Sequence, residues 1–225
     1  MKDLNKKALV GLLRLLLTIA VCIFLPAWTL KYWQAWVLLS VMLVSFLAIT
    51  LYLMENDPRL LERRVHAGPG AEKQKSQQIG QAFGAIAFIA VFLVSALDHR
   101  FAWSSVPPLA AIGGDFLVML GLLVVFFVFK ENTFTSAIIE VAAEQRLIST
   151  GPYSTVRHPM YSGALIMMLG VPPALGSWWG LSAVVPMVLV IVRRVRDEEE
   201  LLERNLAGYR EYRNQVRYRL LPFVW

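Results

Sequence analysis

The chain has 225 residues, of which 57% are hydrophobic and 17% charged, and its mean hydropathy is +0.55. This composition is too apolar for an ordinary soluble domain, and the apolar residues come in long uncharged runs. The net charge of +6 does not indicate nucleic-acid binding, because the basic residues flank the apolar runs on one side. The single cysteine, Cys22, excludes a disulfide framework and a cysteine metal site.

Four apolar runs among the first 130 residues predict membrane-spanning helices. They cover residues 8–30, 33–54, 79–97 and 107–129. Each is about as long as a helix that crosses a bilayer. The fourth run contains Asp115, and an acid inside a span is costly and is by default a functional candidate. We expect instead that Gly113-Gly114 marks the start of that helix, which places Asp115 near the lipid headgroups.

The second half of the chain predicts a connector, a hairpin and a charged tail. Residues 131–158 form a polar connector. Residues 159–192 carry no charged side chain, and Pro172-Pro173 breaks this run in the middle. Two full spans need about 40 residues, so this stretch predicts a helical hairpin with short arms. Leu202, Leu206, Tyr209 and Val216 of the tail, 193–225, fall roughly on one helical face and predict an amphipathic helix, which Gly208 weakens or ends in its first part. The predicted fold is therefore all-α, a polytopic transmembrane helical bundle that forms one domain over residues 1–225.

The distribution of Lys and Arg predicts the orientation in the membrane. If the N-terminus lies inside, 19 of the 22 basic residues fall on inside segments, and only Lys31 and Arg100 lie in outside loops. The positive-inside rule then places both termini, the connector and the tail in the cytoplasm. The connector and the tail bracket the two ends of the hairpin, so we expect them to meet in space.

The polar stretch from Gln145 to Tyr161 is a candidate binding loop. Gly151-Pro152 is typical of a turn, and Pro159 suits the first turn of a new helix. Helix N-termini attract anions, and tyrosine rings attract cations. A loop with both features is suited to a zwitterionic cofactor at the edge of a membrane.

The tail opens with a charged run from Arg193 to Glu200. Taken alone, such a run is typical of a solvated helical face with acids and bases paired at helical spacing. Its position beside His158 and Tyr161 favours a site, because Arg194 and Glu198 then converge with them at the membrane surface. The three histidines of the chain lie on different segments, so we expect no metal site.

Several short motifs of the C-terminal half occur together in one known family. They are Gly151-Pro152-Tyr153, Arg157-His158-Pro159-Met160-Tyr161, Glu198-Glu199 and Gly208-Tyr209-Arg210-Glu211-Tyr212. With the uncharged hairpin between them, they resemble the isoprenylcysteine carboxyl methyltransferase family, which is itself similar to membrane phospholipid methyltransferases. The resemblance covers the C-terminal half in detail and the earlier spans only in number and order. It implies an integral membrane enzyme that uses S-adenosylmethionine without a Rossmann domain.

The resemblance also implies roles for individual residues. Arg194 matches a substrate-side arginine and is the candidate catalytic residue, and Glu198 matches the acid that holds the cofactor. The candidate cofactor-binding residues are Gln145, Arg146, Leu147, Ile148, Tyr153, His158, Pro159, Met160, Tyr161, Glu198 and Glu199. Methyl transfer mainly needs alignment and exclusion of water. We expect a lipophilic or lipid-anchored acceptor that enters from the bilayer, and no nucleic-acid partner.

Three other functions remain open at this point. A phospholipid N-methyltransferase would share the cofactor but methylate an amine. A sterol-reductase-like membrane oxidoreductase carries a similar Arg-His-Pro-x-Tyr element and uses NADPH, whose extra phosphate is disfavoured by Glu198-Glu199. A transporter or scaffold would show polar residues at mid-span and inverted repeats, and neither is evident in the sequence.

Overall fold

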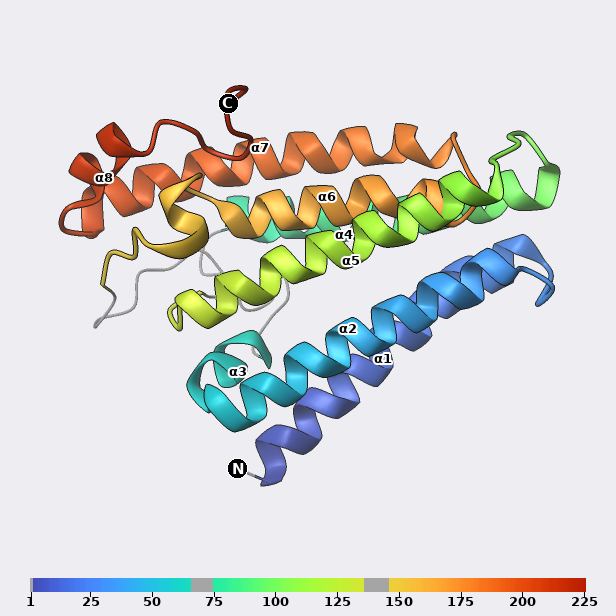
Figure 1. Ribbon diagram of the computed structural model, residues 1–225, viewed down its shortest axis with the longest axis horizontal. Coiled ribbons are helices and arrows are strands. Elements are labelled where there is room, and N and C mark those ends of the chain that lie inside the picture. Colours follow the sequence, from blue (N-terminus) through green and yellow to red (C-terminus); the bar gives the residue numbers. More distant parts are fainter. Residues whose placement is uncertain (1, 66–74, 136–145) are drawn as a thin grey trace.

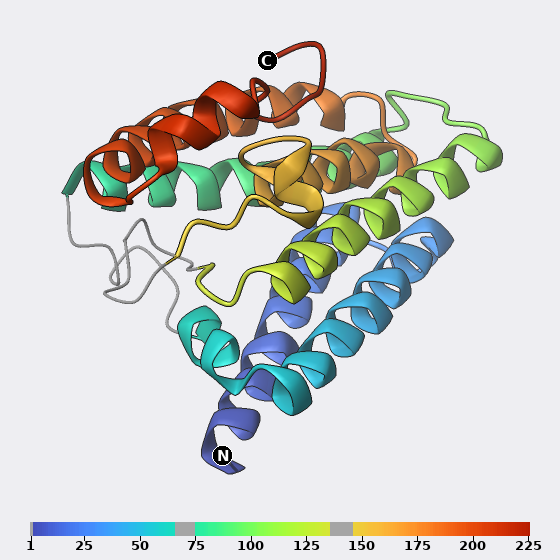
Figure 2. The same ribbon diagram turned by 60° about the vertical axis from the view of Figure 1, so that its left-hand side comes forward.

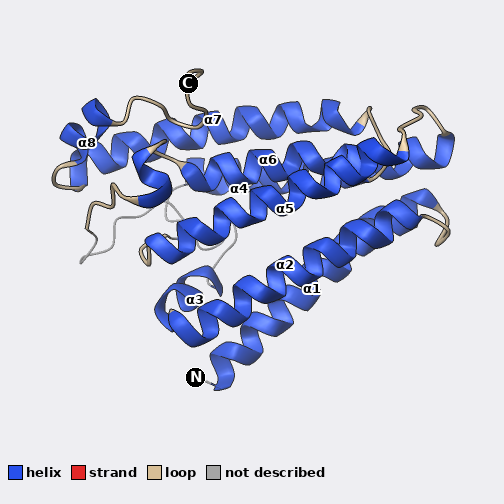
Figure 3. Ribbon diagram, in the orientation of Figure 1, coloured by secondary structure: helices blue, strands red, loops and turns tan. Residues whose placement is uncertain are grey.

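The computed structural model describes residues 2–65, 75–135 and 146–225, and within these ranges the chain is helical without strands (Figure 3). The helices are α1 (Lys2–Ala27), α2 (Trp33–Asn56), α3 (Pro58–Val65), α4 (Lys75–Phe101), α5 (Pro108–Glu131), α6 (Pro159–Ala174), α7 (Gly180–Asn205) and α8 (Tyr209–Gln215). The predicted all-α class is confirmed.

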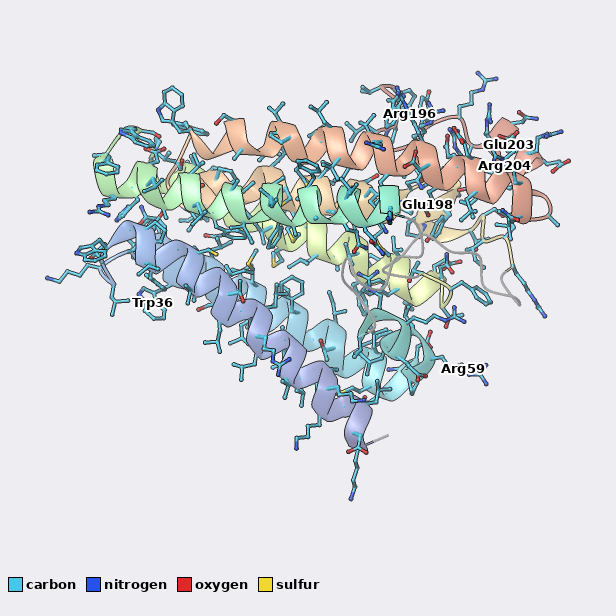
Figure 4. The ribbon with its side chains drawn as sticks, turned by 180° about the vertical axis from the view of Figure 1, so that it is seen from behind. Trp36, Arg59, Arg196, Glu198, Glu203 and Arg204 are labelled. Carbon is cyan, nitrogen blue, oxygen red and sulfur yellow. The ribbon has the colours of Figure 1, made fainter. Side chains whose placement is uncertain are left out.

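Four of the helices are long and apolar enough to cross a membrane: α1, α2, α5 and the part of α4 from Gln78 to Phe101. They coincide with the four apolar runs of the sequence. Many large apolar side chains on them are exposed, as lipid-facing side chains are in a membrane bundle. Trp36, for example, projects outward from one end of the bundle (Figure 4). The chain is therefore an integral membrane protein built as a helical bundle.

The helices form two groups. α4, α5, α6 and α7 pack together, with α6 between α5 and α7, while α1 and α2 run side by side and pack against this group, α1 on α4 and α2 on α5 (Figures 1 and 2). The short helix α3 follows α2 at the end of the bundle that also carries the N-terminus and α8 (Figure 1). That end gathers segments from across the chain, and the candidate site lies there.

Glycines allow α5 and α6 to pack at backbone contact. A Cβ atom on Gly163 would lie 2.8 Å from the carbonyl oxygen of Gly121, and one on Gly170 would lie 2.6 Å from that of Gly114. Both distances are far below van der Waals contact, so only glycine fits. Small residues commonly permit such close approach between membrane helices. This contact fixes where the N-terminus of α6 meets the C-terminus of α5.

The expectation for Asp115 is wrong. α5 begins at Pro108, after Pro107, and not at Gly113-Gly114. Gly114 instead serves the contact with α6, which explains why a glycine stands at this position inside the helix. Asp115 is therefore buried in the bundle, and neither of its carboxylate oxygens has a hydrogen-bond partner among the described residues.

The hairpin has one short arm and one long one. α6 has 16 residues and is about 24 Å long, less than the hydrocarbon core of a bilayer. α7 continues without interruption from Gly180 to Asn205, so the charged run of the tail is the last part of α7. Arg, Glu and Leu are good helix formers, and nothing near Arg193 ends the helix. Gly208, with φ of +81°, then separates α7 from α8, so the tail is not one continuous amphipathic helix.

At the opposite end of the bundle, Asp98 joins the hairpin to α4. Its carboxylate accepts hydrogen bonds from the backbone N–H of Ser104 at 2.7 Å and from Oγ of Ser177 at 2.6 Å. Ser177 lies in the turn between α6 and α7. This buried carboxylate is satisfied by donors from two segments, the loop after α4 and the turn between α6 and α7, as a structural acid must be.

Candidate active site

A cavity of about 100 Å³ opens at the end of the bundle that carries α8. Its walls come from the C-terminal end of α5, the loop before α6, the first turn of α6, the last part of α7, and α8. The 3-10 turn Gly151–Ser154 bends the loop back toward these helices. Tertiary packing therefore brings together residues that lie up to 80 positions apart in the sequence.

Most of the predicted site residues line this cavity. They are Arg146, Leu147, Ile148, Tyr153, His158, Pro159, Met160, Tyr161, Arg194 and Glu198. Gln145 lies outside the described residues. Glu199 does not line the cavity.

Eight further residues line the cavity without having been expected there from the sequence. These are Asn132, Phe134, Thr135, Arg157, Leu202, Leu206, Tyr209 and Tyr212. Arg157, Tyr209 and Tyr212 stand inside the motifs that carried the resemblance, so the motifs did contain a signal for them. Leu202 follows Glu198 by one helical turn on the same face of α7. Nothing in the sequence indicated that the end of α5 would reach the site.

Arg194, Tyr161 and Glu198 form a hydrogen-bonded chain in the cavity wall. Nε of Arg194 donates to the hydroxyl of Tyr161 at 2.9 Å, and that hydroxyl donates to Oε2 of Glu198 at 2.7 Å. Arg194 and Glu198 are four residues apart on α7 and share a face, as the sequence predicts. Arg196 and Arg204 lie on the outer side of the same helix (Figure 4).

Glu199 belongs to a buried ion-pair cluster. Its carboxylate accepts hydrogen bonds from Nε of Arg157 at 2.7 Å and from Nε of Arg219 at 2.8 Å. Successive residues on a helix point about 100° apart, so Glu199 faces the C-terminal segment while Glu198 faces the cavity. The geometry therefore gives Glu199 a structural position rather than the cofactor contact expected from the sequence.

The partners of Glu199 keep it ionised. Burial raises the pKa of its carboxyl, but contacts with His158, Arg157 and Arg219 outweigh burial and bring the pKa down to about 2. Nε2 of His158 lies 3.4 Å from Oε1 of Glu199, at ion-pair distance but without hydrogen-bond geometry. The two arginines, with short and well-directed bonds, are therefore the main source of the lowering.

Hydrogen bonds join the C-terminal segment to the loop before α6. Nη1 of Arg157 donates to the carbonyl of Val216 at 2.7 Å, and the backbone N–H of His158 donates to the carbonyl of Arg219 at 2.9 Å. Farther along the loop, the hydroxyl of Tyr212 donates to the carbonyl of Tyr153 at 2.7 Å. These bonds hold His158 and the tyrosines in place around the cavity.

Two buried polar atoms of the cavity wall have no hydrogen-bond partner in the described part of the chain. They are Nε2 of His158 and the hydroxyl of Tyr209. Buried polar groups are nearly always hydrogen-bonded, so such atoms at a cavity commonly mark a place for water or ligand. Burial, with the nearby Glu199, raises the pKa of Tyr209, so its hydroxyl stays protonated and can donate.

These groups suit a polar ligand that carries both signs of charge. Glu198 supplies a negative charge for a cation, and the ring of Tyr153 or Tyr161 offers a π-face. His158 and Tyr209 supply polar atoms near the N-terminus of α6, where an anion is favoured. S-adenosylmethionine has all these features. The volume of about 100 Å³ that the described residues enclose is below the roughly 300–1,000 Å³ of ligand pockets.

A comparison with known families decides the assignment of this segment. Residues 109–208 match the model of the phospholipid methyltransferase family. Over this segment, which is less than half of the chain, the sequence is similar to the phospholipid methyltransferase family. The resemblance stated from the sequence is thereby confirmed, and the family indicates a membrane methyltransferase. The segment contains α5, α6, α7 and all the described lining residues except Tyr209 and Tyr212.

A second comparison finds a protein with a different activity in its name. The Delta(14)-sterol reductase of Mus musculus is 34% identical over 97 residues, which is 39% of this chain and 22% of that protein. The chain thus spans about a fifth of the length of this curated relative. The chain is therefore similar both to a family named for methyl transfer and to a protein named as a reductase.

Proposed function

We propose that the protein is an S-adenosylmethionine-dependent methyltransferase that acts on a lipophilic acceptor at the membrane surface. One observation carries the proposal: Glu198, within the segment that matches the family, faces the same cavity as Nε2 of His158 and the hydroxyl of Tyr209, neither of which has a hydrogen-bond partner in the described part of the chain. A carboxylate opposite two such groups suits a ligand with a cationic and an anionic end.

The residues of the cavity bind and orient in this proposal. S-adenosylmethionine, when bound, supplies an electrophilic methyl group on a positively charged sulfur. Glu198 attracts the positive charge of the cofactor, and the hydroxyl of Tyr209 donates to its carboxylate. Tyr161 stands between Arg194 and Glu198 and holds both side chains in position. Leu202 and Leu206 exclude water from this end of the cavity.

Arg194 is suited to meet the acceptor. It lines the cofactor cavity and also a groove of about 220 Å³ between α4 and α7, whose wall includes Ile79, Phe83 and Leu189. A lipophilic acceptor in that groove would place its polar end next to the guanidinium. Arg194 would then position an acceptor carboxylate, which needs no base because it is already a nucleophile.

This arrangement favours carboxyl O-methylation of the kind carried out by the isoprenylcysteine carboxyl methyltransferases. Methylation of a phospholipid amine remains the alternative within the family, and it would need a group that removes a proton from the amine. A comparison of turnover with a prenylated cysteine carboxylate and with phosphatidylethanolamine distinguishes the two acceptors. Faster turnover of the amine would overturn the proposed carboxyl acceptor.

Binding measurements test the cofactor. Isothermal titration of the purified full chain in detergent is expected to show saturable binding of S-adenosylmethionine and none of NADPH. The similarity to a sterol reductase makes NADPH the specific alternative. Saturable NADPH binding without S-adenosylmethionine binding would overturn the methyltransferase proposal in favour of a reductase.

A further inference from the structure

A second and larger cavity lies among α1, α2, α3 and α5. Its volume is about 740 Å³, within the range of cavities that hold small molecules. Three of these helices, α1, α2 and α5, are candidate membrane spans, so the cavity lies beside the lipid. It shares no lining residue with the candidate active site.

The lining of this cavity is divided into apolar and cationic parts. Apolar side chains such as Phe46, Leu53 and Val125 form most of the wall. Four cations also line it, Lys6, Lys7, Arg14 and Arg64, and the described residues of its lining include no Asp or Glu. A hydroxyl in the wall, that of Thr50, donates to the carbonyl of Phe46 within its own helix. The cavity therefore complements a molecule with an apolar body and a negatively charged end.

The cations gather at the end of the bundle that carries the candidate active site. Lys6 and Lys7 lie in the first turns of α1, and Arg64 lies in the last turn of α3. The guanidinium of Arg64 lies 5.0 Å from the ring centre of Phe129, and its Nη1 is 3.8 Å from Sδ of Met160. Met160 lines the active-site cavity, so the two cavities are separated by little more than this pair of side chains.

We propose that this cavity binds a membrane lipid with an anionic phosphate headgroup. The acyl chains occupy the apolar part between α1, α2 and α5, and the phosphate is held by Lys6, Lys7, Arg14 and Arg64. Basic pockets between transmembrane helices bind anionic headgroups in this way. A zwitterionic lipid would bring its own cation against four others, and a free phosphate would leave the apolar wall uncovered. This binding is separate from the proposed methyl transfer and does not depend on it.

Native mass spectrometry of the full chain in detergent tests the proposal. The protein is titrated with short-chain phosphatidylglycerol, with phosphatidylcholine of the same chains, and with inorganic phosphate. We expect one phosphatidylglycerol to bind saturably, and phosphatidylcholine to bind more weakly by about tenfold or more, because each cation near an anionic headgroup adds to affinity. Equal binding of both lipids would overturn the anionic site, and displacement of the lipid by inorganic phosphate would assign the cations to free phosphate.

A pair of glycine variants tests the location. A Cβ atom added at Gly11 meets no atom within 4 Å, so we expect the ring of Gly11→Phe to enter the cavity that Gly11 lines. Gly113 has the same open surroundings but lies outside the cavity, so Gly113→Phe is the matched control. We expect Gly11→Phe to abolish phosphatidylglycerol binding and Gly113→Phe to retain it. Retention of full affinity by Gly11→Phe would overturn the location.

A pair of charge variants tests the headgroup contacts even if Gly11→Phe does not fold. Lys7→Gln with Arg14→Gln removes two cations from exposed positions on α1 and is expected to weaken phosphatidylglycerol binding by roughly 30-fold. Lys2→Gln with Lys130→Gln removes two exposed cations that do not line the cavity and is expected to change nothing. If both double variants weakened binding equally, general surface charge would explain it and the site would be overturned.

Discussion

Two adjacent glutamates of α7 have different surroundings. Glu198 faces the cavity and is hydrogen-bonded to Tyr161, whereas Glu199 is buried between Arg157 and Arg219. The first has an environment suited to ligand binding, and the second joins three segments of the fold. Substitution of each should therefore affect a different measured property.

We expect Glu198→Gln to weaken S-adenosylmethionine binding by roughly ten- to a hundredfold, because a charge-assisted contact contributes about 1.5–3 kcal/mol. Glu200→Gln is the matched control, since Glu200 is exposed and pairs only at the surface with Arg204. Isothermal titration measures both. Unchanged affinity in Glu198→Gln would assign the cofactor to other residues of the cavity.

We expect Arg194→Ala to leave cofactor affinity within a few-fold of wild type and to lower turnover of the acceptor. The physical reason is that Arg194 also lines the apolar groove between α4 and α7, where the acceptor is proposed to bind. Turnover against acceptor concentration, measured beside cofactor titration, separates the two effects. Loss of cofactor binding in Arg194→Ala, with Glu198→Gln unaffected, would show that the two roles are reversed.

The stability of the fold should depend on the ionisation of Glu199. Its folded pKa of about 2 lies below the ordinary value of 4.5, so its contribution is complete above about pH 4.5 and is lost as the pH falls toward 2. A shift of this size corresponds to about 3 kcal/mol. Glu199→Gln should lower the unfolding temperature at neutral pH and remove this part of the acid dependence.

Unfolding temperatures in detergent between pH 7 and about pH 2 check this expectation. Glu200→Gln, on the exposed side of the same helix, is expected to keep the wild-type dependence. A Glu199→Gln protein as stable as wild type at neutral pH would show that the ion pairs gain nothing over their desolvation cost.

At the scale of elements, the contact between α5 and α6 positions the site. Its glycines let the first turn of α6, with His158 and Tyr161, reach the end of α5. The hairpin then returns through α7, whose uninterrupted length carries Glu198 to the same end. A change in the distance between α5 and α6 would displace the walls of the cavity.

We expect Gly121→Ala to destabilise the protein by about 1–3 kcal/mol, because the new methyl group would overlap the backbone of α6 near Gly163. Gly113→Ala is the control, since a Cβ there meets nothing within 4 Å, and it should be neutral or stabilising by up to about 1 kcal/mol. Thermal unfolding in detergent measures both. Equal stability of the two variants would contradict the backbone contact.

At the scale of the whole molecule, the N-terminus, α3, α8 and the candidate active site lie at one end of the bundle (Figures 1 and 2). Asp98 and the turn between α6 and α7 lie at the other end. The excess of Lys and Arg at the first end leads us to propose that this end faces the cytoplasm. The lipid would then reach the protein from the cytoplasmic leaflet, and the soluble cofactor would reach it from the cytoplasm.

Thiol labelling tests this orientation. In a chain with Cys22 replaced by Ser, cysteines at the exposed positions Arg59 and Ser105 lie at opposite ends of the bundle. An impermeant thiol reagent applied to intact cells should label Ser105→Cys, and should label Arg59→Cys only after the membrane is opened. The reverse pattern would invert the proposed orientation.

The sequence by itself determined the number of apolar spans, the end of the bundle with the excess of basic residues, and most of the cavity lining. Hydropathy, charge and short motifs are properties of consecutive residues, so they can be read without a fold. The uninterrupted charged end of α7 is also a local property, but the end of the apolar run wrongly suggested a boundary at Arg193.

The tertiary structure alone decided which groups meet. The burial of Asp115 depends on the approach of α6, and the separate surroundings of Glu198 and Glu199 depend on the rotation of α7 about its axis. The approach of α5 and Tyr209 to the cavity, and the position of Arg64 beside Met160, also depend on packing between distant segments. Such contacts are set by the relative placement of helices, to which hydropathy and charge patterns along one chain are insensitive.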